Sequence, residues 1–450
     1  MDYKEVISYL NSFFDLENIS HYDYSRELNL DRMRDLLVVF DNPQNQFKSV
    51  HVAGSKGKGT VAVSLYQILK ECGYNAGLYT SPHLLSFRER IRVSSNVTKD
   101  PLGFGDTITE EEIAEIISQI KPSLEDFSSK SRWGKPTFFE VYTLLAFLYF
   151  VREKIDLAII EVGLGGRLDA TNLINPIATA ITKIVFEHTD KLGDTILKIA
   201  KEKTGILKKG VSCVLGVQKW EEVETIVKDK AKDISLPLFI VGENIEFMKD
   251  RSSFSIKIDD HMYQDLKTNL MGSFQLENLA VTVALSHLLK KEFSISDEKI
   301  KSALLNIYWP GRMQIVKKNP CIILDAAHTT ESISILGKEL KDRFKNKDIT
   351  TILAISKDKD REGIIKEAVL FSKEIIFTHI DNPRLSESEE LLLIAEKLSL
   401  DCFSQEHNFM GLINRVCEYD KDDKIFLITG SIFLVSRALE VFKYGLLQVR

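Results

Sequence analysis

One stretch, from Lys48 to Lys70, constrains the fold of this chain more than any other. Residues Ser49–Ala53 are rich in β-forming side chains, and from Thr60 onward the apolar residues recur at helical spacing. Three glycines separate the two patterns, namely Gly54, Gly57 and Gly59. We therefore expect a strand that enters a helix through a glycine-rich turn.

A turn of this kind suits phosphate, because it gathers backbone N–H groups at the positive end of a helix dipole. The side chain of Lys58 can neutralise phosphate oxygens, and the hydroxyl of Thr60 can reach a Mg²⁺ ion that bridges them. The match to the Walker pattern is imperfect, since Val52 occupies the place of the first glycine and Gly59 separates Lys58 from Thr60. A glycine-rich connection without a ligand is the simpler alternative.

Chain length and charge limit the class of protein. A chain of 450 residues exceeds one typical hydrophobic core, so two domains are expected. The net charge of −6 gives no reason to expect a nucleic-acid partner. The N-terminus lacks a signal-peptide pattern, and the most apolar segment, Val141–Val151, is too short to span a bilayer. The five cysteines show no CxxC spacing, and we expect a monomer in the reducing cytoplasm, without a membrane partner.

Polar residues follow several expected strands, at the edge where open α/β sheets bind ligands. Glu161 ends an apolar run that has the pattern of a strand buried on both faces. Together with Thr60 and Ser81 it offers the oxygen ligands that Mg²⁺ prefers. The alternatives are that Glu161 caps a helix or pairs with Arg167, and that His188 is a satisfied histidine at a strand end.

The segment Phe87–Val93, with the sequence FRERIRV, carries three arginines. If the segment is extended, Arg88, Arg90 and Arg92 lie on one face. Such a row serves a ligand or is simply an exposed charged strand, and the sequence favours neither interpretation over the other.

The C-terminal third of the chain restarts the alternation of strand and helix. Trp309–Arg312 combines a proline with a glycine, and we expect a boundary there between domains 1–309 and 310–450. Four apolar strands from Cys321 onward predict a smaller, Rossmann-like α/β unit with a parallel core. Weak alternation between Pro237 and Leu270 predicts a small antiparallel sheet in the first domain. The expected fold class is α/β, with a mainly parallel, P-loop-type first domain.

Seven motifs occur in one order between Ala53 and His328: AGSKGKGTV, TSPHLLSFRERI, EVGLGGRLDATN, EHTDKLGDTILKIAKEKTGI, FQLENLAV, WPGRMQIV and LDAAH. In this order they resemble the folylpolyglutamate synthase and dihydrofolate synthase family, within the Mur ligase superfamily. A further segment, Thr429–Val435, fits the last strand of that family. The resemblance covers nearly the whole chain.

The resemblance implies roles for individual residues. The catalytic set would be Lys58 on the transferred phosphoryl group, Lys203 as a carbamylated lysine, and His328 close to ribose and phosphate. The magnesium ligands would be Thr60, Ser81, Glu161 and His188. The nucleotide would be held by Gly54, Ser55, Lys56, Gly57, Lys58, Gly59, Thr60, Asn278, Arg312 and Asp325. The acid substrate would be held by Arg90, Thr137, Phe139, Asp169 and Ala170.

The implied reaction is the formation of an amide bond driven by ATP. A carboxylate of folate or dihydropteroate attacks the γ-phosphate to give an acyl phosphate and ADP, and the amine of L-glutamate then displaces phosphate. Two magnesium ions assist, and a monovalent cation could join them. The alternatives are a Mur-type ligase that acts on a UDP-sugar precursor and an ATP-dependent switch that ligates nothing. The motifs FRERIRV and EVGLGGRLDATN favour the folate branch, and a switch would not need the second α/β unit.

Overall fold

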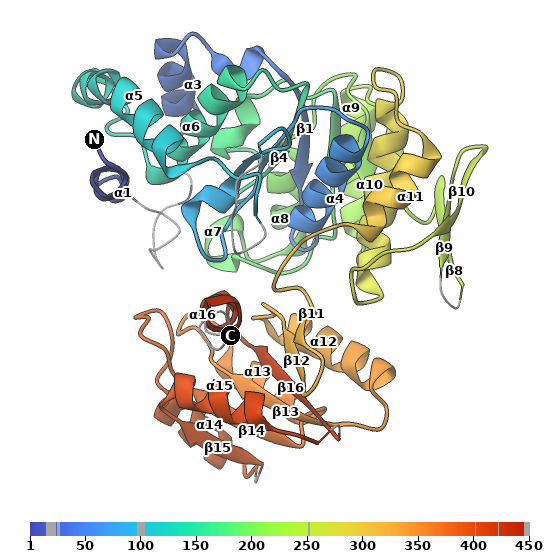
Figure 1. Cartoon of the computed structure of the whole chain (residues 1–450). Coiled ribbons are helices and arrows are strands. Elements are labelled where there is room, and N and C mark those ends of the chain that lie inside the picture. Colours follow the sequence, from blue (N-terminus) through green and yellow to red (C-terminus); the bar gives the residue numbers. More distant parts are fainter. Residues whose placement is uncertain are drawn as a thin grey trace. The chain divides into compact units, whose positions relative to one another are not determined.

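The computed structural model describes residues 1–14, 24, 28–96, 104–250, 253–400, 402–421 and 423–444. The chain divides into two compact units, one formed by Met1–Asn269 with Phe274–Tyr308 and the other by Leu270–Ser273 with Trp309–Arg450. Each unit is built on its own large sheet (Figure 1). Within the described part of the chain, no helix combines the length and apolar character needed to cross a bilayer.

A seven-stranded sheet organises the first unit, with the strand order β3-β2-β4-β1-β5-β6-β7. Strand β3 runs antiparallel to β2, whereas the other neighbouring pairs are parallel. The inner strands are apolar and buried, because helices cover both faces of such a sheet. The strands are β1 (Lys48–Ala53), β2 (Ala76–Tyr79), β3 (Ile91–Val93), β4 (Leu157–Glu161), β5 (Ala178–Ile181), β6 (Cys213–Leu215) and β7 (Leu238–Ile240).

Helices surround this sheet (Figure 1). They are α1 (Tyr3–Asn11), α3 (Leu30–Val39), α4 (Lys58–Glu71), α5 (Glu110–Lys130), α6 (Phe138–Arg152), α7 (Thr189–Leu192), α8 (Ile196–Thr204), α9 (Glu221–Asp233), α10 (Phe274–Leu289) and α11 (Asp297–Leu305). A separate antiparallel sheet has the order β10-β9-β8. Its strands are β8 (Ile245–Lys249), β9 (Phe254–Ile258) and β10 (His261–Leu266).

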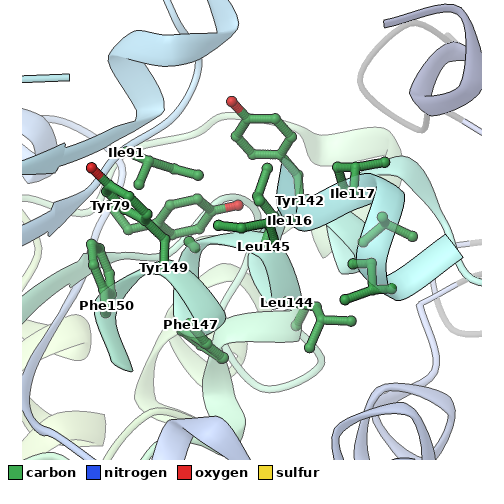
Figure 2. Close-up of a cluster of buried hydrophobic side chains, with 14 of the residues drawn as sticks. Tyr79, Ile91, Ile116, Ile117, Tyr142, Leu144, Leu145, Phe147, Tyr149 and Phe150 are labelled. Atoms are coloured by element: carbon green, nitrogen blue, oxygen red, sulfur yellow. The ribbon is translucent and has the colours of Figure 1, made fainter. Parts of the chain in front are cut away.

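A large hydrophobic cluster of the first unit lies where α5 and α6 pack against the sheet (Figure 2). Helix α6 is apolar around most of its circumference, so it is buried on nearly every face. Each large apolar side chain buried here contributes roughly 1.5–3 kcal/mol relative to its exposed state. Figure 2 labels ten members of the cluster: Tyr79, Ile91, Ile116, Ile117, Tyr142, Leu144, Leu145, Phe147, Tyr149 and Phe150.

The segment Phe87–Val93 is not extended throughout, so the condition for a single row of arginines is not met. Phe87–Arg90 is a turn of 3-10 helix, closed by a serine–glutamate capping box, and only the last three residues form β3. Arg90 and Arg92 are 1% and 5% exposed, so they do not belong to a solvated charged strand either. Arg92 is paired with a carboxylate inside the first unit, and Arg90 is enclosed there by other side chains.

A buried ionic network fastens α4, which follows the glycine-rich turn, to the segment after β3. Asp106 accepts hydrogen bonds from Arg92 at 2.7 and 3.0 Å, from the Tyr66 hydroxyl at 2.7 Å and from Lys70 at 3.2 Å. Burial alone would raise the pKa of Asp106, but the Arg92 guanidinium outweighs burial and lowers that pKa to about 2. The network therefore holds its carboxylate ionised.

This network makes stability depend on pH in a defined direction. The pKa of Asp106 rises from about 2 when folded to 3.8 when unfolded, so its stabilisation is full above pH 4 and is lost between about pH 4 and pH 2. We expect Asp106→Asn to lower the free energy of unfolding by about 3 kcal/mol at pH 7, because Arg92 stays buried without its anion. Urea titrations at pH 7 and pH 3 measure this, with exposed Asp233→Asn as the control. Equal unfolding free energies for wild type and Asp106→Asn at pH 7 would contradict it.

The second unit contains a six-stranded sheet with the order β11-β12-β16-β13-β14-β15, in which β11 is antiparallel to β12 and the other pairs are parallel. Its strands are β11 (Gln314–Lys317), β12 (Cys321–Leu324), β13 (Asp348–Leu353), β14 (Glu374–Thr378), β15 (Phe403–Glu406) and β16 (Lys424–Thr429). Its helices are α12 (Thr330–Arg343), α13 (Arg361–Val369), α14 (Ser388–Lys397), α15 (Phe409–Glu418) and α16 (Ile432–Tyr444). The predicted α/β fold class is confirmed, including the small antiparallel sheet and the second parallel core.

Candidate functional site

Four neighbouring strands of the first sheet deliver polar residues to one edge. The strands lie in the order β2-β4-β1-β5 and are mutually parallel, so their carboxyl ends meet at that edge. Ser81, Glu161, Thr60 and His188 follow or end these strands in the same order. The backbone N–H of Ser81 donates to Oε2 of Glu161 at 3.1 Å. Glu161 is only 4% exposed, so its carboxylate is held at the strand end.

The glycine-rich turn after β1 prepares the N-terminus of α4 for an anion. Gly57 precedes the helix in a left-handed conformation, with φ at 96°, and no side chain caps the helix. The N–H groups of the first turn point away from the helix and attract negative charge. A Cβ atom at Gly57 would lie 2.1 Å from Oδ1 of Asn278, and one at Gly54 would lie 1.9 Å from Oγ1 of Thr182. Both glycines are therefore required, and Asn278 lies directly against the turn.

The first part of the turn is tied to the strand beside it. The backbone N–H groups of Ser55 and Lys56 donate to the carbonyl of Lys183 at 2.9 and 3.0 Å. The Ser55 hydroxyl donates to the carbonyl of Val185 at 3.0 Å. These donors already have partners within the protein, so the N–H groups at the start of α4 are better placed to receive phosphate. Contact between the nucleotide and Ser55 or Lys56 stays a prediction.

Two lysines converge on one carbonyl of the turn. Lys58 and Lys203 donate to the Gly54 carbonyl at 3.1 and 2.9 Å, and Lys203 also donates to Oε1 of Glu187 at 3.1 Å. Lys203 is 2% exposed. Burial, with help from Lys58 and against the attraction of Glu187, lowers the pKa of Lys203 to about 8. The structure thus brings together two of the predicted catalytic residues.

Glu187 is a residue of this site to which the sequence analysis gave no role. Burial raises its pKa, but Lys203, Lys58 and Lys56 outweigh burial and lower that pKa to about 2. The sequence contained one signal, since Glu187 directly precedes the predicted ligand His188. His188 itself has φ at 47°, a left-handed conformation that is costly for a residue other than glycine. Such strain is common where surrounding structure holds a functional side chain in place.

The side chains at this edge of the sheet can be compared with the ligands that magnesium prefers. Among the described residues, no group of three or more histidine, cysteine, aspartate or glutamate side chains is placed to hold a metal. The residues at the sheet edge are two hydroxyls, Thr60 and Ser81, with the carboxylate Glu161 and the imidazole His188. Magnesium accepts few protein ligands and completes its shell with water and phosphate oxygens. The donor set therefore fits magnesium that arrives with a nucleotide.

The loop after β4 is held by its own acidic residue. Asp169 is 2% exposed and accepts hydrogen bonds from the backbone N–H groups of Leu164 at 2.9 Å and of Thr171 at 3.0 Å, and from the Thr171 hydroxyl. Its carboxylate is therefore committed to the loop, and Ala170 beside it is buried. Arg167 forms an ion pair with Glu202, in which Nε and Nη2 donate to the same oxygen, Oε1, at 3.0 and 2.8 Å. The alternative in which Arg167 pairs with Glu161 is wrong.

The remaining predicted substrate residues lie near the start of α6. Thr137 caps that helix and is buried, while the ring of the half-buried Phe139 would lie 2.5 Å from a Cβ atom at Gly163. Arg90 donates from Nε to Nδ1 of His83 at 2.9 Å. Its guanidinium carbon also lies within 6 Å of three ring centroids, those of Phe87, Phe138 and Tyr142. Their contact with the acid substrate stays a prediction.

The second unit gathers its predicted residues at the carboxyl end of β12. Asp325 accepts from the backbone N–H groups of Met313 and Ala327, both at 2.8 Å. Burial raises the pKa of Asp325, against the opposing effect of nearby Arg312. His328 donates from Nδ1 to a backbone carbonyl two residues earlier at 2.9 Å. Arg312 thus lies near Asp325, and His328 follows Asp325 by three residues.

Two family models match the chain. The Mur ligase middle domain matches residues 52–286, and the C-terminal domain of dihydrofolate synthetase matches residues 308–441. A dihydrofolate synthase/folylpolyglutamate synthase of Bacillus subtilis is 34% identical over 415 residues, which cover 90% of this chain and 93% of the relative. A folylpolyglutamate synthase of Lacticaseibacillus casei is 29% identical over 460 residues, covering 99% of this chain and all of the relative.

Solved structures share the fold over nearly the whole length. Folylpolyglutamate synthase of Thermotoga maritima superposes with a TM-score of 0.83 at 29% identity, covering 98% of this chain and 97% of its own. A structure described as an FPGS–AMPPCP–folate complex superposes with a TM-score of 0.80 at 26% identity, covering 97% of this chain and 98% of its own.

Proposed function

This chain belongs to the folylpolyglutamate synthase and dihydrofolate synthase family of ATP-dependent glutamate ligases, and we propose that it joins L-glutamate both to folate and to dihydropteroate. One observation supports this proposal most strongly. The start of α4, which no side chain caps, lies at the same edge of the sheet as Lys58, Lys203 and Glu161. A related protein was solved with AMPPCP and folate, which supports ATP and a folate as substrates here. We further propose an ATP-binding domain at 1–309 and a glutamate-ligase domain at 310–450.

The phosphate turn would act on the first chemical step. The substrate carboxylate attacks the γ-phosphate, and negative charge spreads over the phosphoryl oxygens as ADP leaves. We propose that Lys58 and the N–H groups at the start of α4 stabilise this charge. Magnesium held by Thr60, Ser81, Glu161 and His188 would supply further positive charge when bound. The resulting acyl phosphate is then attacked by the amine of L-glutamate, and phosphate leaves.

Lys203 is proposed to carry a carbamate. Burial lowers the pKa of Lys203 to about 8, which favours the neutral amine, and only that form adds carbon dioxide. In the described structure Glu187 pairs with the ammonium form, at 3.1 Å. Carbamate formation would replace this ion pair by two neighbouring anions, whose mutual repulsion a bound divalent cation would offset. The proposal therefore links carbamylation to metal binding.

If Lys203 carries a carbamate, small carboxylic acids should restore activity to a variant that lacks this lysine. We expect Lys203→Ala to lower kcat by about 10²-fold or more, and short carboxylic acids to restore part of it by supplying the missing anion. The measurement is ADP release at increasing acetate or propionate concentration, with Lys201→Ala on the exposed face of α8 as the control. Loss of activity that no acid restores, together with unaltered ¹³C spectra of the wild type in labelled bicarbonate, would contradict the carbamate.

An assay separates the proposed function from its alternatives. The protein is incubated with ATP, Mg²⁺ and L-glutamate, and ADP release is measured with dihydropteroate, with tetrahydrofolate and with neither. We expect turnover with both pteridines and none when glutamate is omitted. Turnover that ignores both pteridines but responds to a UDP-muramyl acceptor would establish the Mur-type alternative. ADP release that requires no acceptor would establish a non-ligating ATPase.

A further inference from the structure

A chain of buried side chains connects the strand before the phosphate turn with the loop that follows Glu161. His51 on β1 has its Nε2 atom 2.9 Å from Oγ1 of Thr171. The Thr171 hydroxyl in turn donates to the carboxylate of Asp169. The three side chains are 0%, 0% and 2% exposed. The reaction described above gives neither His51 nor Thr171 any part.

The direction of the hydrogen bonds follows from the proton count. The partners of the Asp169 carboxylate described above are donors, so the single hydroxyl proton of Thr171 is directed to it. The Thr171 oxygen must then accept, which requires the proton of His51 to be on Nε2. Burial lowers the pKa of His51 to about 3, in agreement with a neutral ring. Nδ1 of His51 has no hydrogen-bond partner among the described residues, so a proton on it would be a buried unpaired donor, and the proton on Nε2 avoids this.

The series of hydrogen-bonded side chains His51, Thr171 and Asp169 ends on a loop that contacts two parts of the proposed site. Asp169 closes the segment Gly163–Asp169 by accepting from its backbone. The first glycine of this segment lies against the ring of Phe139, at 2.5 Å from where a Cβ atom would be. Its third glycine lies against α8, where a Cβ atom would approach Cα of Lys203 to 3.2 Å. A shift of the loop would therefore move both contacts.

We infer that His51 and Thr171 are positioning residues that act through Asp169, and that this buried chain sets the shape of the Gly163–Asp169 loop where it faces the pteridine substrate. The inference rests on the proposed function. Asp169 then serves the pteridine by holding the loop closed rather than by accepting a hydrogen bond from the ligand. The loop is joined through β1 to the phosphate turn, because His51 lies three residues before Gly54.

Substitutions that preserve side-chain shape test this series of hydrogen bonds. Thr171→Val keeps the shape and removes the hydroxyl, and we expect the KM for the pteridine to rise about tenfold, as for the loss of a buried hydrogen bond, while the KM for ATP changes less than about twofold. Thr171→Ser keeps the hydroxyl and should retain the wild-type KM. His51→Gln places an amide N–H near the position of Nε2 and should be milder than His51→Leu.

A matched control separates positioning from general loss of stability. Thr179 is a buried threonine on β5, the strand beside His51, and its hydroxyl donates to the Ser212 carbonyl at 3.3 Å. Thr179→Val should lower the melting temperature similarly without raising the KM for the pteridine. The inference is overturned if Thr171→Val and Thr179→Val give equal KM values, or if Thr171→Ser behaves like Thr171→Val. Absence of pteridine turnover in the wild type would instead refute the proposed function.

Discussion

Replacing Lys58 by alanine is expected to lower kcat by about 10³-fold or more, with the fold preserved. The side chain lies at the start of α4 and donates to the Gly54 carbonyl at 3.1 Å, so its ammonium group is held at the turn where phosphate would bind. Its loss removes a positive charge from the phosphoryl group in flight. Lys58 is only partly buried, so its replacement should cost little stability.

The measurement for Lys58 is steady-state ADP release combined with thermal unfolding. Lys198→Ala is the control, since Lys198 is an exposed lysine whose partner is Asp194, away from the turn. We expect the control to retain full turnover and both variants to unfold like the wild type. A Lys58→Ala enzyme with near-wild-type kcat would remove the phosphate turn from the mechanism.

Replacing Glu161 by alanine is expected to have an effect of similar size, about 10³-fold on kcat, together with a higher requirement for magnesium. Glu161 ends β4 with its carboxylate bound to the Ser81 N–H at 3.1 Å, so it is fixed beside one of the other predicted ligands. It is the only carboxylate among the four predicted ligands. Its removal leaves hydroxyl and imidazole groups, which hold magnesium weakly.

Two further variants distinguish the charge of Glu161 from its hydrogen bond. Glu161→Gln keeps an oxygen that can accept from the Ser81 N–H but loses the negative charge, whereas Glu161→Asp keeps the charge on a shorter side chain. Titration of activity with Mg²⁺ should show a higher half-saturating concentration for Glu161→Gln and a smaller change for Glu161→Asp. If Glu161→Gln saturates at the wild-type magnesium concentration, Glu161 is not a metal ligand.

Several site contacts could not be predicted, because they join residues far apart in the chain. Glu187 pairs with Lys203 at 3.1 Å across sixteen positions, and nothing in the local pattern around either residue indicates the pair. Asn278 touches the phosphate turn only because α10 packs beside α4, with a glycine at the contact. The resemblance of the motifs to a known family identified Lys203 and Asn278 as site residues. Only the structure showed which residues they contact.

The arginines of FRERIRV show where local reasoning failed. Strand periodicity would place Arg88, Arg90 and Arg92 on one face, yet a serine–glutamate capping box winds the first four residues into a 3-10 turn. Arg92 is then buried against Asp106, fourteen residues later. Arg92 is buried because a distant carboxylate, that of Asp106, packs against it. The spacing of the arginines does not reveal this partner.

The sequence by itself determined the α/β fold class and the glycine-rich turn, because these depend on hydrophobic periodicity and on backbone conformations that nearby residues favour. Glycine at positions 54 and 57, with Lys58 and Thr60 after it, already predicted an anion at the start of a helix. Only the tertiary structure decided which charges are paired, which carboxylate closes the Gly163–Asp169 loop and how far the pKa of Lys203 falls. Those properties depend on burial and on distances between strands, and both arise only when distant segments pack together.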